Sequence, residues 1–215
     1  YTGRQISGFT TRTQVQNTPN DFNCEHTFPQ SFFSSASPMI SDMHHLFPTD
    51  NNANNQRANT AFGVVLGAPT WSQGGSKLGG GVFEPRDVHK GAVARAMLYF
   101  GIMYGGNATV QISYLTPQEP TLKSWANQYL PTAIDLRRNS DISGAQGNRN
   151  PLVDYPQLLN RMGMLSTNSD LPRSKSYWVS AQRTFSSTPS DEHRISIYNT
   201  GTDTLILGGS GSYSP

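Results

Sequence analysis

Cysteine is nearly absent from this chain, since Cys24 is the only one among 215 residues. An internal disulfide is therefore excluded, and cysteine usage leaves the redox compartment open. Long apolar runs are also lacking, because no segment approaches the ~20 residues of a membrane-spanning helix. The first residues, YTGRQISGFTTRT, lack both an initiator Met and the apolar core of a signal peptide. This start favours either a mature chain, from which a signal peptide could have been removed, or a trimmed one.

Charge of either sign is scarce as well. Only 14% of the residues are charged, and the formal net charge at pH 7 is +2. A strong nucleic-acid binder usually has a larger or more clustered positive excess, so this charge permits an anionic partner without demanding one. Hydrophobic residues make up 35%, and Asn, Ser, Thr and Gln fill the difference, which is typical of a loop-rich protein. The length suits one domain with a small appendage.

The segment DVHKGAVARAMLYFGIMY, residues 87–104, has the clearest helical pattern. Apolar residues recur there at spacings of three and four, which predicts a helix with one stripe toward the core: Val88, Ala92, Ala96, Tyr99 and Met103. Pro85 at the entry fits a helix start. We therefore expect the main core helix of the domain here.

Other segments predict shorter elements. NNANNQRAN, residues 51–59, is mediocre helix material, but Thr49 or Asp50 could cap it, and we expect a short helix. NATVQISYL, residues 107–115, alternates well enough for a strand. Further helices are expected on either side of Pro131 and before Gly163, at 121–130, 132–142 and 153–163.

The C-terminal residues differ in kind. RISIYNTGTDTLILGG, residues 194–209, has two alternating apolar runs joined by a Thr-Gly-Thr-Asp turn, which predicts a β-hairpin. It follows the Ser/Thr/Pro segment TFSSTPSDEH. We therefore predict a main domain over 1–185 and a C-terminal β-hairpin segment over 186–215, which is either an appended hairpin or the start of a separate β module.

Adjacent polar residues indicate a site at the end of an early strand. Glu25 and His26 stand side by side in DFNCEHTFPQSFF, and an Asn-rich segment follows. Carboxylate and amide oxygens suit a hard divalent cation, while a neutral imidazole can accept a proton, so this set is typical of metal-assisted hydrolysis. Neighbouring residues of a regular strand face opposite ways, so both can serve one site only where the strand ends or bends. Pro29 supports an ending.

The short helix expected at 51–59 adds two more polar side chains. Asn54 and Arg57 lie three residues apart, and Ala58 lies four from Asn54, so an amide oxygen and a guanidinium would share a face with a small residue. That face could hold a metal ion and touch a phosphate.

Several ordered blocks resemble the bacterial endonuclease I family. EHTFPQS and DMHHLFPTDNNANNQRANTAFG are similar to blocks of that family, and further blocks follow in the same order: FEPRDVHKGAVARAMLYF, LKSWANQYL with IDLRRN, and QGNRNPLVDYPQL. The resemblance covers roughly residues 23–163. Several ordered blocks are far more specific than one motif.

The resemblance implies a fold and an activity. The fold is α+β, with a ββα-metal core (a His-Me finger) near residues 23–60 and helices packed around it. Family members are secreted or periplasmic, bind one divalent ion, usually magnesium, and cut DNA, in some cases also RNA, without sequence preference. We therefore expect a metal-dependent endonuclease that acts as a monomer and uses Mg²⁺, with Mn²⁺ or Ca²⁺ as alternatives.

Position by position, the resemblance makes His26 the general base that activates the attacking water. Glu25 becomes one metal ligand and Asn54 a second, while water and phosphate oxygens complete the coordination. Base catalysis by the imidazole and electrostatic stabilisation by the metal ion would accelerate hydrolysis. The expected products have 5′-phosphate ends.

One departure concerns the phosphate contact. Some family members place an arginine between the Glu-His pair and the Asp-x-His block, but the intervening TFPQSFFSSASPMIS contains none. Arg57 is then a candidate catalytic contact to the phosphate, and the other nucleic-acid-binding candidates are Arg137, Arg138, Arg149 and Asn148. The loop from Asn148 to Asn150 is either an ordinary turn or a phosphate clamp.

Several alternatives stay open. His44 and His45 suggest a zinc pair, but on a strand they would face apart and no further ligand completes a tetrahedral set; we expect one to order the site and the other to be structural. Arg95 is either an exposed or salt-bridged residue or a DNA contact. Cys24 is expected to be a buried thiol on the opposite face of its strand. An extracellular ribonuclease with the same site, and a catalytically silent nucleic-acid-binding or adhesion module, remain rivals of the DNase.

Overall fold

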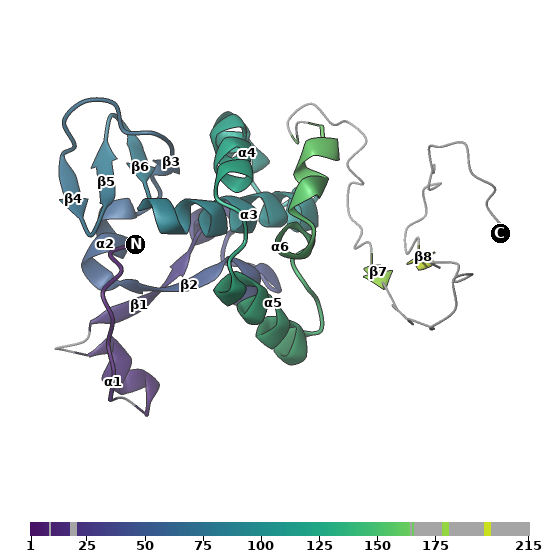
Figure 1. Ribbon diagram of the computed structural model, residues 1–215, viewed down its shortest axis with the longest axis horizontal. Helices are drawn as coiled ribbons and strands as arrows, with labels where there is room; N and C mark the ends of the chain where they lie inside the picture. The colour runs from purple at the N-terminus through teal and green to yellow at the C-terminus, as the bar shows by residue number, and fades with distance from the viewer. Residues whose placement is uncertain (9, 18–20, 164, 166–177, 181–195, 199–215) are drawn as a thin grey trace. The chain divides into compact units, whose positions relative to one another are not determined.

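The computed structural model describes residues 1–8, 10–17, 21–163, 165, 178–180 and 196–198. The chain divides into two compact units, Tyr1–Leu171 and Pro172–Pro215. The first unit mixes helices with short strands (Figure 1), which confirms the expected α+β class.

The first unit is built from short elements around one long helix. Its α-helices are α1 (Arg12–Gln16), α2 (Asn51–Arg57), α3 (Asp87–Tyr104), α4 (Glu119–Gln128), α5 (Ala133–Gln146) and α6 (Pro151–Asp154). Its strands are β1 (Phe22–His26), β2 (Leu46–Asp50), β3 (Ala61–Phe62), β4 (Trp71–Gln73), β5 (Ser76–Gly79) and β6 (Val82–Glu84). Its 3-10 helices are η1 (Gln30–Phe33), η2 (Met39–Ser41), η3 (Met43–His45), η4 (Ile112–Tyr114), η5 (Thr116–Gln118) and η6 (Pro156–Arg161). Strands β3 to β6 form one sheet in the order β3-β6-β5-β4.

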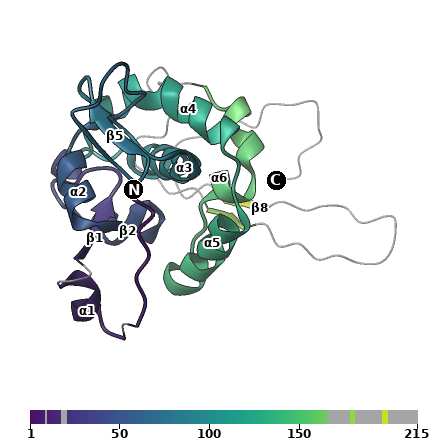
Figure 2. The same ribbon diagram turned by 60° about the vertical axis from the view of Figure 1, so that its left-hand side comes forward.

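Helix α3 is the centre of the first unit. Figures 1 and 2 show it enclosed by α4, α5, the sheet of β3 to β6 and the strands β1 and β2, and all residues from Val93 to Gly101 are buried. The expected bounds, 87–104, are confirmed. The expected single core-facing stripe is wrong, because Val88 is 74% exposed. Since the helix is surrounded, burial depends on position along it and not on one face.

Aromatic rings join α3 to the segment that follows β1. Phe28 stacks on Phe100 with ring centroids 4.2 Å apart, and Phe33 lies against Phe100 at 5.4 Å. All three side chains are fully buried. Ring pairs of this kind add to the stabilisation that burial gives, so the residues just after His26 are fixed to the central helix.

Strands β1 and β2 form a two-stranded antiparallel sheet that leads directly into α2. The register pairs His26 with Leu46 at one end of the sheet. At the other end Asp50 caps α2, because its carboxylate accepts hydrogen bonds from the backbone N–H groups of Asn52 (3.1 Å) and Ala53 (3.3 Å). The short helix expected here is confirmed.

The strand expected at 107–115 is wrong, because these residues form turns, including η4. Val110 and Leu115 are buried, whereas the residues between them are half-buried or exposed. Spaced apolar residues can anchor a turn to a core as well as a strand, so the alternation was ambiguous.

The helix expected at 153–163 is interrupted. Helix α6 ends at Asp154 and η6 begins at Pro156. A proline lacks the N–H that a continuing helix needs and disfavours a helical backbone at the residue before it, here Tyr155. The helices expected on either side of Pro131 are confirmed as α4 and α5.

In the second unit, strands β7 (Trp178–Ser180) and β8 (Ser196–Tyr198) pair antiparallel. The second run of the hairpin expected at 194–209 lies outside the described residues, as does the expected boundary after residue 185. The hairpin and the division at 185/186 therefore stay predictions.

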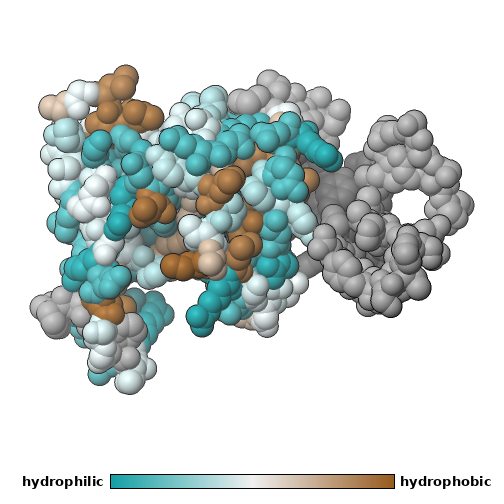
Figure 3. Space-filling view, in the orientation of Figure 1, coloured by the Kyte–Doolittle hydropathy of each residue, from teal (hydrophilic) through white to brown (hydrophobic). Residues whose placement is uncertain are grey.

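Both hydrophilic and hydrophobic side chains lie at the surface of the described residues (Figure 3). Figure 3 shows hydrophobic residues on one face as separate patches, and the exposed large hydrophobic side chains are Val64, Leu66, Val88, Leu130, Ile134, Leu136 and Tyr155. None of the helices in the described ranges has the length and apolar character to cross a membrane.

Replacing Phe100 with alanine should destabilise the first unit by about 3–5 kcal/mol, because it removes a fully buried ring from the cluster that joins α3 to residues 28–33. Urea unfolding followed by tryptophan fluorescence measures the loss. Val88→Ala, on the exposed first turn of the same helix, is the control and should change stability by less than about 0.5 kcal/mol. Equal losses in the two variants would contradict the central position of Phe100.

Candidate active site

Strand β1 ends at His26, which confirms the expected strand ending next to Glu25 and His26. The chain turns there because Thr27 binds the carbonyl of His45 twice, through its backbone N–H (3.0 Å) and its hydroxyl (2.7 Å). Glu25 is 3% exposed, and His26 is half-buried.

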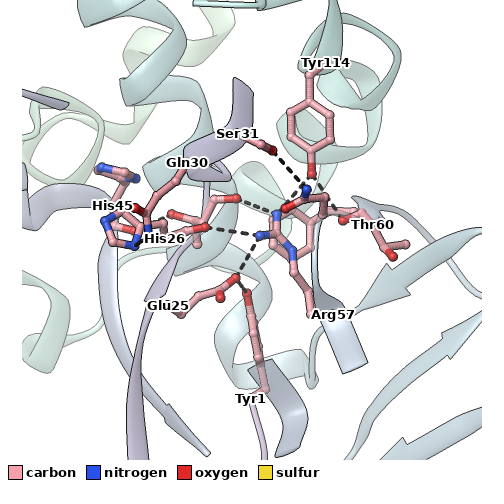
Figure 4. A network of polar contacts seen from close by, with 12 residues as sticks. Tyr1, Glu25, His26, Gln30, Ser31, His45, Arg57, Thr60 and Tyr114 are labelled. Atoms are coloured by element: carbon pink, nitrogen blue, oxygen red, sulfur yellow. Dashed lines mark hydrogen bonds and ion pairs between the residues drawn. The ribbon is translucent and has the colours of Figure 1, made fainter. Parts of the chain in front are cut away.

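Glu25 is held at one oxygen by two donors from distant parts of the chain. Its Oε1 accepts a hydrogen bond from the Tyr1 hydroxyl at 2.5 Å and forms an ion pair with Arg57 Nη1 at 3.0 Å (Figure 4). Burial raises the pKa of Glu25, and the Arg57 guanidinium opposes that rise. A buried carboxylate needs such a partner, since an unpaired charge in this position would be strongly destabilising.

Arg57 turns its guanidinium toward protein groups. It is 1% exposed, and besides Glu25 it donates to the carbonyls of His26 (3.2 Å) and Thr27 (2.6 Å) and to the Tyr114 hydroxyl (3.1 Å). Figure 4 shows these partners around it. The side chain expected to touch a phosphate therefore joins α2 to the end of β1.

The His26 imidazole has a different partner at each ring nitrogen. Its Nε2 lies 3.0 Å from the carbonyl oxygen of Ile40. A carbonyl can only accept, so we assign the proton to Nε2. The lone pair is then on Nδ1, which accepts from the side-chain amide of Gln30 at 3.1 Å. Burial lowers the pKa of His26, which favours the neutral ring that a general base requires.

His44 and His45 lie on the 3-10 helix η3 and not on the expected strand, and both are buried. His45 donates from Nε2 to the carbonyl of Met39 at 2.7 Å, and its ring lies 5.4 Å from that of His26. His44 pairs with the carbonyl of Asn148 at 3.0 Å. Across the described ranges, no three His, Cys, Asp or Glu side chains gather where they could hold a metal ion.

Asp42 is a structural centre that the sequence reasoning missed. Its buried carboxylate accepts hydrogen bonds from the hydroxyls of Tyr99 (2.9 Å) and Tyr104 (2.7 Å), the amide of Gln146 (2.9 Å) and the backbone N–H of His44 (2.9 Å). These bonds lower the pKa of Asp42 against the effect of burial. They fix the turn whose carbonyls, at residues 39 and 40, receive His45 and His26. The one signal in the sequence was the Asp-x-His spacing, which suits capping of a short turn.

Asn54 lies one turn before Arg57 on α2 and is half-buried. Side chains three apart on a helix share a face, and Arg57 contacts Glu25 on β1. The spacing therefore puts Asn54 on the same side of α2 as Arg57.

The expected nucleic-acid-binding residues fall into two groups. Arg138 donates to the carbonyls of Met43 and Leu46, and Asn148 donates to the Tyr99 hydroxyl at 2.7 Å, so both support the turn at η3. Arg149 forms a two-bond ion pair with Asp154. The Arg137 side chain is 86% exposed and lies 3.8 Å from Asp141.

Arg95 and Cys24 lie outside the proposed site, and the structure decides the expectation for each. Arg95 is buried, donates to the carbonyl of Tyr129 at 2.7 Å and lies 3.6 Å from Asp135; of the two readings, the salt-bridged one holds. Cys24, expected to be buried, is exposed. It belongs to a two-stranded antiparallel sheet, and such a sheet can leave the side chains of one face in contact with solvent.

Comparison with known proteins shows the family of this chain. The endonuclease I family model matches residues 1–157, which include every site residue described above. The chain belongs to the endonuclease I family. An extracellular ribonuclease of Bacillus amyloliquefaciens is 32% identical over 152 residues, covering 64% of this chain and 52% of the relative.

Other relatives of this chain are deoxyribonucleases by name. A periplasmic deoxyribonuclease of Aeromonas hydrophila is 32% identical over 120 residues, covering 54% of this chain and 48% of the relative. An extracellular deoxyribonuclease of the same organism is 33% identical over 122 residues, with 54% and 50% covered. The chain thus spans about half the length of the curated relatives it matches.

Arg57→Met should destabilise the first unit by about 3–5 kcal/mol, because it leaves the buried Glu25 carboxylate without its cation. Urea unfolding measures the loss. Arg137→Met, the same substitution on an exposed side chain, should stay within about 0.5 kcal/mol. Adding Glu25→Leu to Arg57→Met should restore part of the stability; a double variant less stable than the single one would contradict the ion-pair account.

Acid should destabilise the fold through His45. Burial lowers the pKa of His45 to about 4 from an ordinary value of 6.5. The unfolded chain takes up this proton below its ordinary pKa, whereas the folded chain does so only near pH 4. Stability from this group is therefore complete above pH 6.5 and falls by about 1.4 kcal/mol per unit toward pH 4. Urea unfolding at several pH values tests the slope, and an NMR titration that gives His45 an ordinary pKa would contradict it.

Proposed function

We propose that this protein is a divalent-metal-dependent endonuclease that hydrolyses phosphodiester bonds of DNA without sequence preference and leaves 5′-phosphate ends. The observation that supports this most is the position of the His26 imidazole, whose Nε2 binds the Ile40 carbonyl and whose Nδ1 faces the Gln30 amide, in the residue next to Glu25 at the end of β1. A general base and a hard-oxygen ligand in adjacent positions suit metal-assisted hydrolysis.

The arrangement of β1, β2 and α2 supports a ββα-metal core. The two strands pair antiparallel over their whole length, and α2 begins at the residue after β2. Arg57 on α2 contacts Glu25 on β1, so the helix packs back on the strands. A ββα-metal site needs this connection, since its two protein ligands come from strand and helix.

The residue types present fit a hard divalent cation. Oε1 of Glu25 is occupied, while Oε2 has no hydrogen-bond partner within the described part of the chain. The amide oxygen of Asn54 is a second hard donor on the facing helix. Two such ligands, with the rest of the shell left to water and phosphate, suit Mg²⁺, and Mn²⁺ or Ca²⁺ as substitutes. When bound, the ion would stabilise charge on the phosphoryl group and on the leaving oxygen.

His26 would perform the proton transfer. A water molecule would give its proton to Nδ1 while its oxygen forms the new bond to phosphorus. The bond from phosphorus to the 3′ oxygen would break, and the departing 3′ oxygen would take a proton from solvent water. The Nε2–H bond to Ile40 holds the ring in place and favours its protonated form during the reaction. Base catalysis of this kind contributes ~10²- to 10⁴-fold. Gln30 must release Nδ1 for the water to bind there.

Arg57 is assigned a positioning role toward Glu25 in this mechanism, since its donors are directed at protein acceptors. Arg138 and Asn148 support the turn behind His26. Among the expected nucleic-acid-binding residues, Arg137 and Arg149 have the more exposed side chains, at 86% and 40%, and they are the proposed backbone contacts. Such contacts give affinity without reading sequence.

RNA is the second candidate substrate. The ribonuclease relatives align over 64% of this chain, against 54% for the deoxyribonucleases. The relatives are named extracellular or periplasmic nucleases, which supports the proposal that this protein is secreted or periplasmic. We also propose that the enzyme acts as a monomer.

Supercoiled plasmid incubated with Mg²⁺ should be nicked, and EDTA should abolish nicking. His26→Ala should reduce the rate by ~10²- to 10⁴-fold because the base is lost, and Asn54→Ala should raise the Mg²⁺ concentration required. Structured RNA in parallel lanes decides between the substrates. Agarose gels with timed samples measure all of these.

The matched control is Asn52→Ala, because Asn52 is exposed on the same helix and should leave both rate and Mg²⁺ requirement unchanged. The nuclease proposal fails if plasmid and RNA both stay intact with Mg²⁺, Mn²⁺ and Ca²⁺ while a gel shift still shows binding. That result would support a catalytically silent nucleic-acid-binding module.

A further inference from the structure

The Tyr1 side chain enters the candidate active site from a segment that the motif does not include. Its hydroxyl donates to Glu25 Oε1 at 2.5 Å, across 24 positions of sequence. Figure 4 shows the hydroxyl on the same side of the carboxylate as Arg57. Two donors from different segments thus bind one oxygen of Glu25.

Packing holds Tyr1 in this position. The residue is 7% exposed, and its ring lies 4.8 Å from that of Phe83 and 5.6 Å from that of His89. Its backbone carbonyl accepts a hydrogen bond from the Ser76 hydroxyl at 2.9 Å. Contacts to β5, β6 and α3 therefore fix the ring, and the ring fixes the direction of the hydroxyl.

The same segment is attached a second time, three residues later. Arg4 forms an ion pair with Asp50 at 2.8 Å, and its guanidinium lies over the ring of Phe22 at 4.5 Å. Asp50 is the residue that caps α2. Residues 1–4 thus connect the sheet of β3 to β6 with β1 and with the start of α2. Strand β1 and helix α2 supply the proposed metal ligands.

A carboxylate bound at one oxygen by two fixed donors is restrained from rotating about its Cγ–Cδ bond. The other oxygen, Oε2, then keeps a constant direction and has no hydrogen-bond partner among the described side chains. Groups that orient a metal ligand in this way typically change metal affinity by ~10- to 100-fold when they are removed.

We propose that Tyr1 is a positioning residue for the metal ion: its hydroxyl, together with Arg57, holds Oε1 of Glu25 so that Oε2 is presented for coordination. This inference rests on the proposed metal-binding role of Glu25. Tyr1 does not touch substrate, and its effect is exerted on metal affinity and not on the chemical step.

Tyr1→Phe tests the inference, because it keeps the buried ring and removes only the hydroxyl. The dissociation constant for Mn²⁺, measured by electron paramagnetic resonance on substrate-free protein, should rise ~10- to 100-fold. The Mg²⁺ concentration for half-maximal plasmid cleavage should rise in parallel, while the rate at saturating Mg²⁺ should return close to that of wild type.

Tyr104→Phe is the matched control. It also removes a tyrosine hydroxyl that donates to a carboxylate, at 2.7 Å to Asp42, but that carboxylate is no proposed ligand. Its Mn²⁺ affinity should equal that of wild type. Equal Mn²⁺ affinities in wild type, Tyr1→Phe and Tyr104→Phe would overturn the inference and leave the proposed nuclease intact. A wild-type protein that binds no Mn²⁺ and is indifferent to EDTA would instead overturn the proposed function, and the inference with it.

A second measurement avoids dependence on the variant's folding. In wild-type protein labelled with ¹³Cζ tyrosine, the Tyr1 resonance should shift as Mg²⁺ is added, because coordination at Oε2 changes the charge on the oxygen that the hydroxyl contacts. A Tyr1 resonance that stays constant while the metal site saturates would overturn the inference.

Discussion

The buried ion pair between Glu25 and Arg57 is the contact on which the rest of this structure depends. With side-chain exposures of 4% and 1%, neither charge has water to stabilise it, so each needs the other. The same guanidinium also donates to the carbonyls at the end of β1, where the strand stops and the chain turns into the aromatic core. The Arg57 guanidinium thus compensates the Glu25 charge, packs α2 on β1 and binds the carbonyls where the strand ends. These three effects depend on one side chain, and they fix the backbone at the adjacent residues Glu25 and His26.

A second level of organisation fixes the imidazole. Two carbonyls of one turn, at Met39 and Ile40, receive the Nε2–H groups of His45 and His26. That turn is anchored by Asp42, and Asp42 by tyrosines on the central helix α3. The proton position on His26 is thus set by backbone geometry, which is more rigid than a side-chain partner would be. The lone pair on Nδ1, by contrast, faces the side-chain amide of the exposed Gln30. The backbone therefore holds Nε2 in place, whereas Gln30 can be displaced from Nδ1 by a molecule from solvent.

Local features were predictable from sequence, and remote ones were not. The bounds of α3 follow from apolar spacing and a nearby proline, and the end of β1 from Pro29. Glu25, His26 and Asn54 are proposed as site residues because their types and the ordered blocks point to them. Arg57 was expected to contact a phosphate, because a sequence shows that a side chain is charged but not the direction in which it points. In the structure its guanidinium points at protein groups. Tyr1 and the side-chain donors to Asp42 were missed because these contacts span between 24 and 104 positions, and no periodicity relates such pairs. The strand expected at 107–115 failed because apolar spacing also serves a turn.

The hydrogen bonds of Asp42 have a consequence for where the site begins and ends along the chain. Gln146 reaches Asp42 from the end of α5, and Asn148 binds both Tyr99 and His44 through its side chain and backbone. The proposed metal ligands and general base all lie between Glu25 and Asn54, yet the turn that holds His26 is completed by Gln146 and Asn148, far later in the chain. A fragment that ends after Asn54 would contain the chemical groups without the scaffold that directs them. During synthesis, the proposed site would therefore be completed only after α5 and the residues that follow it have emerged.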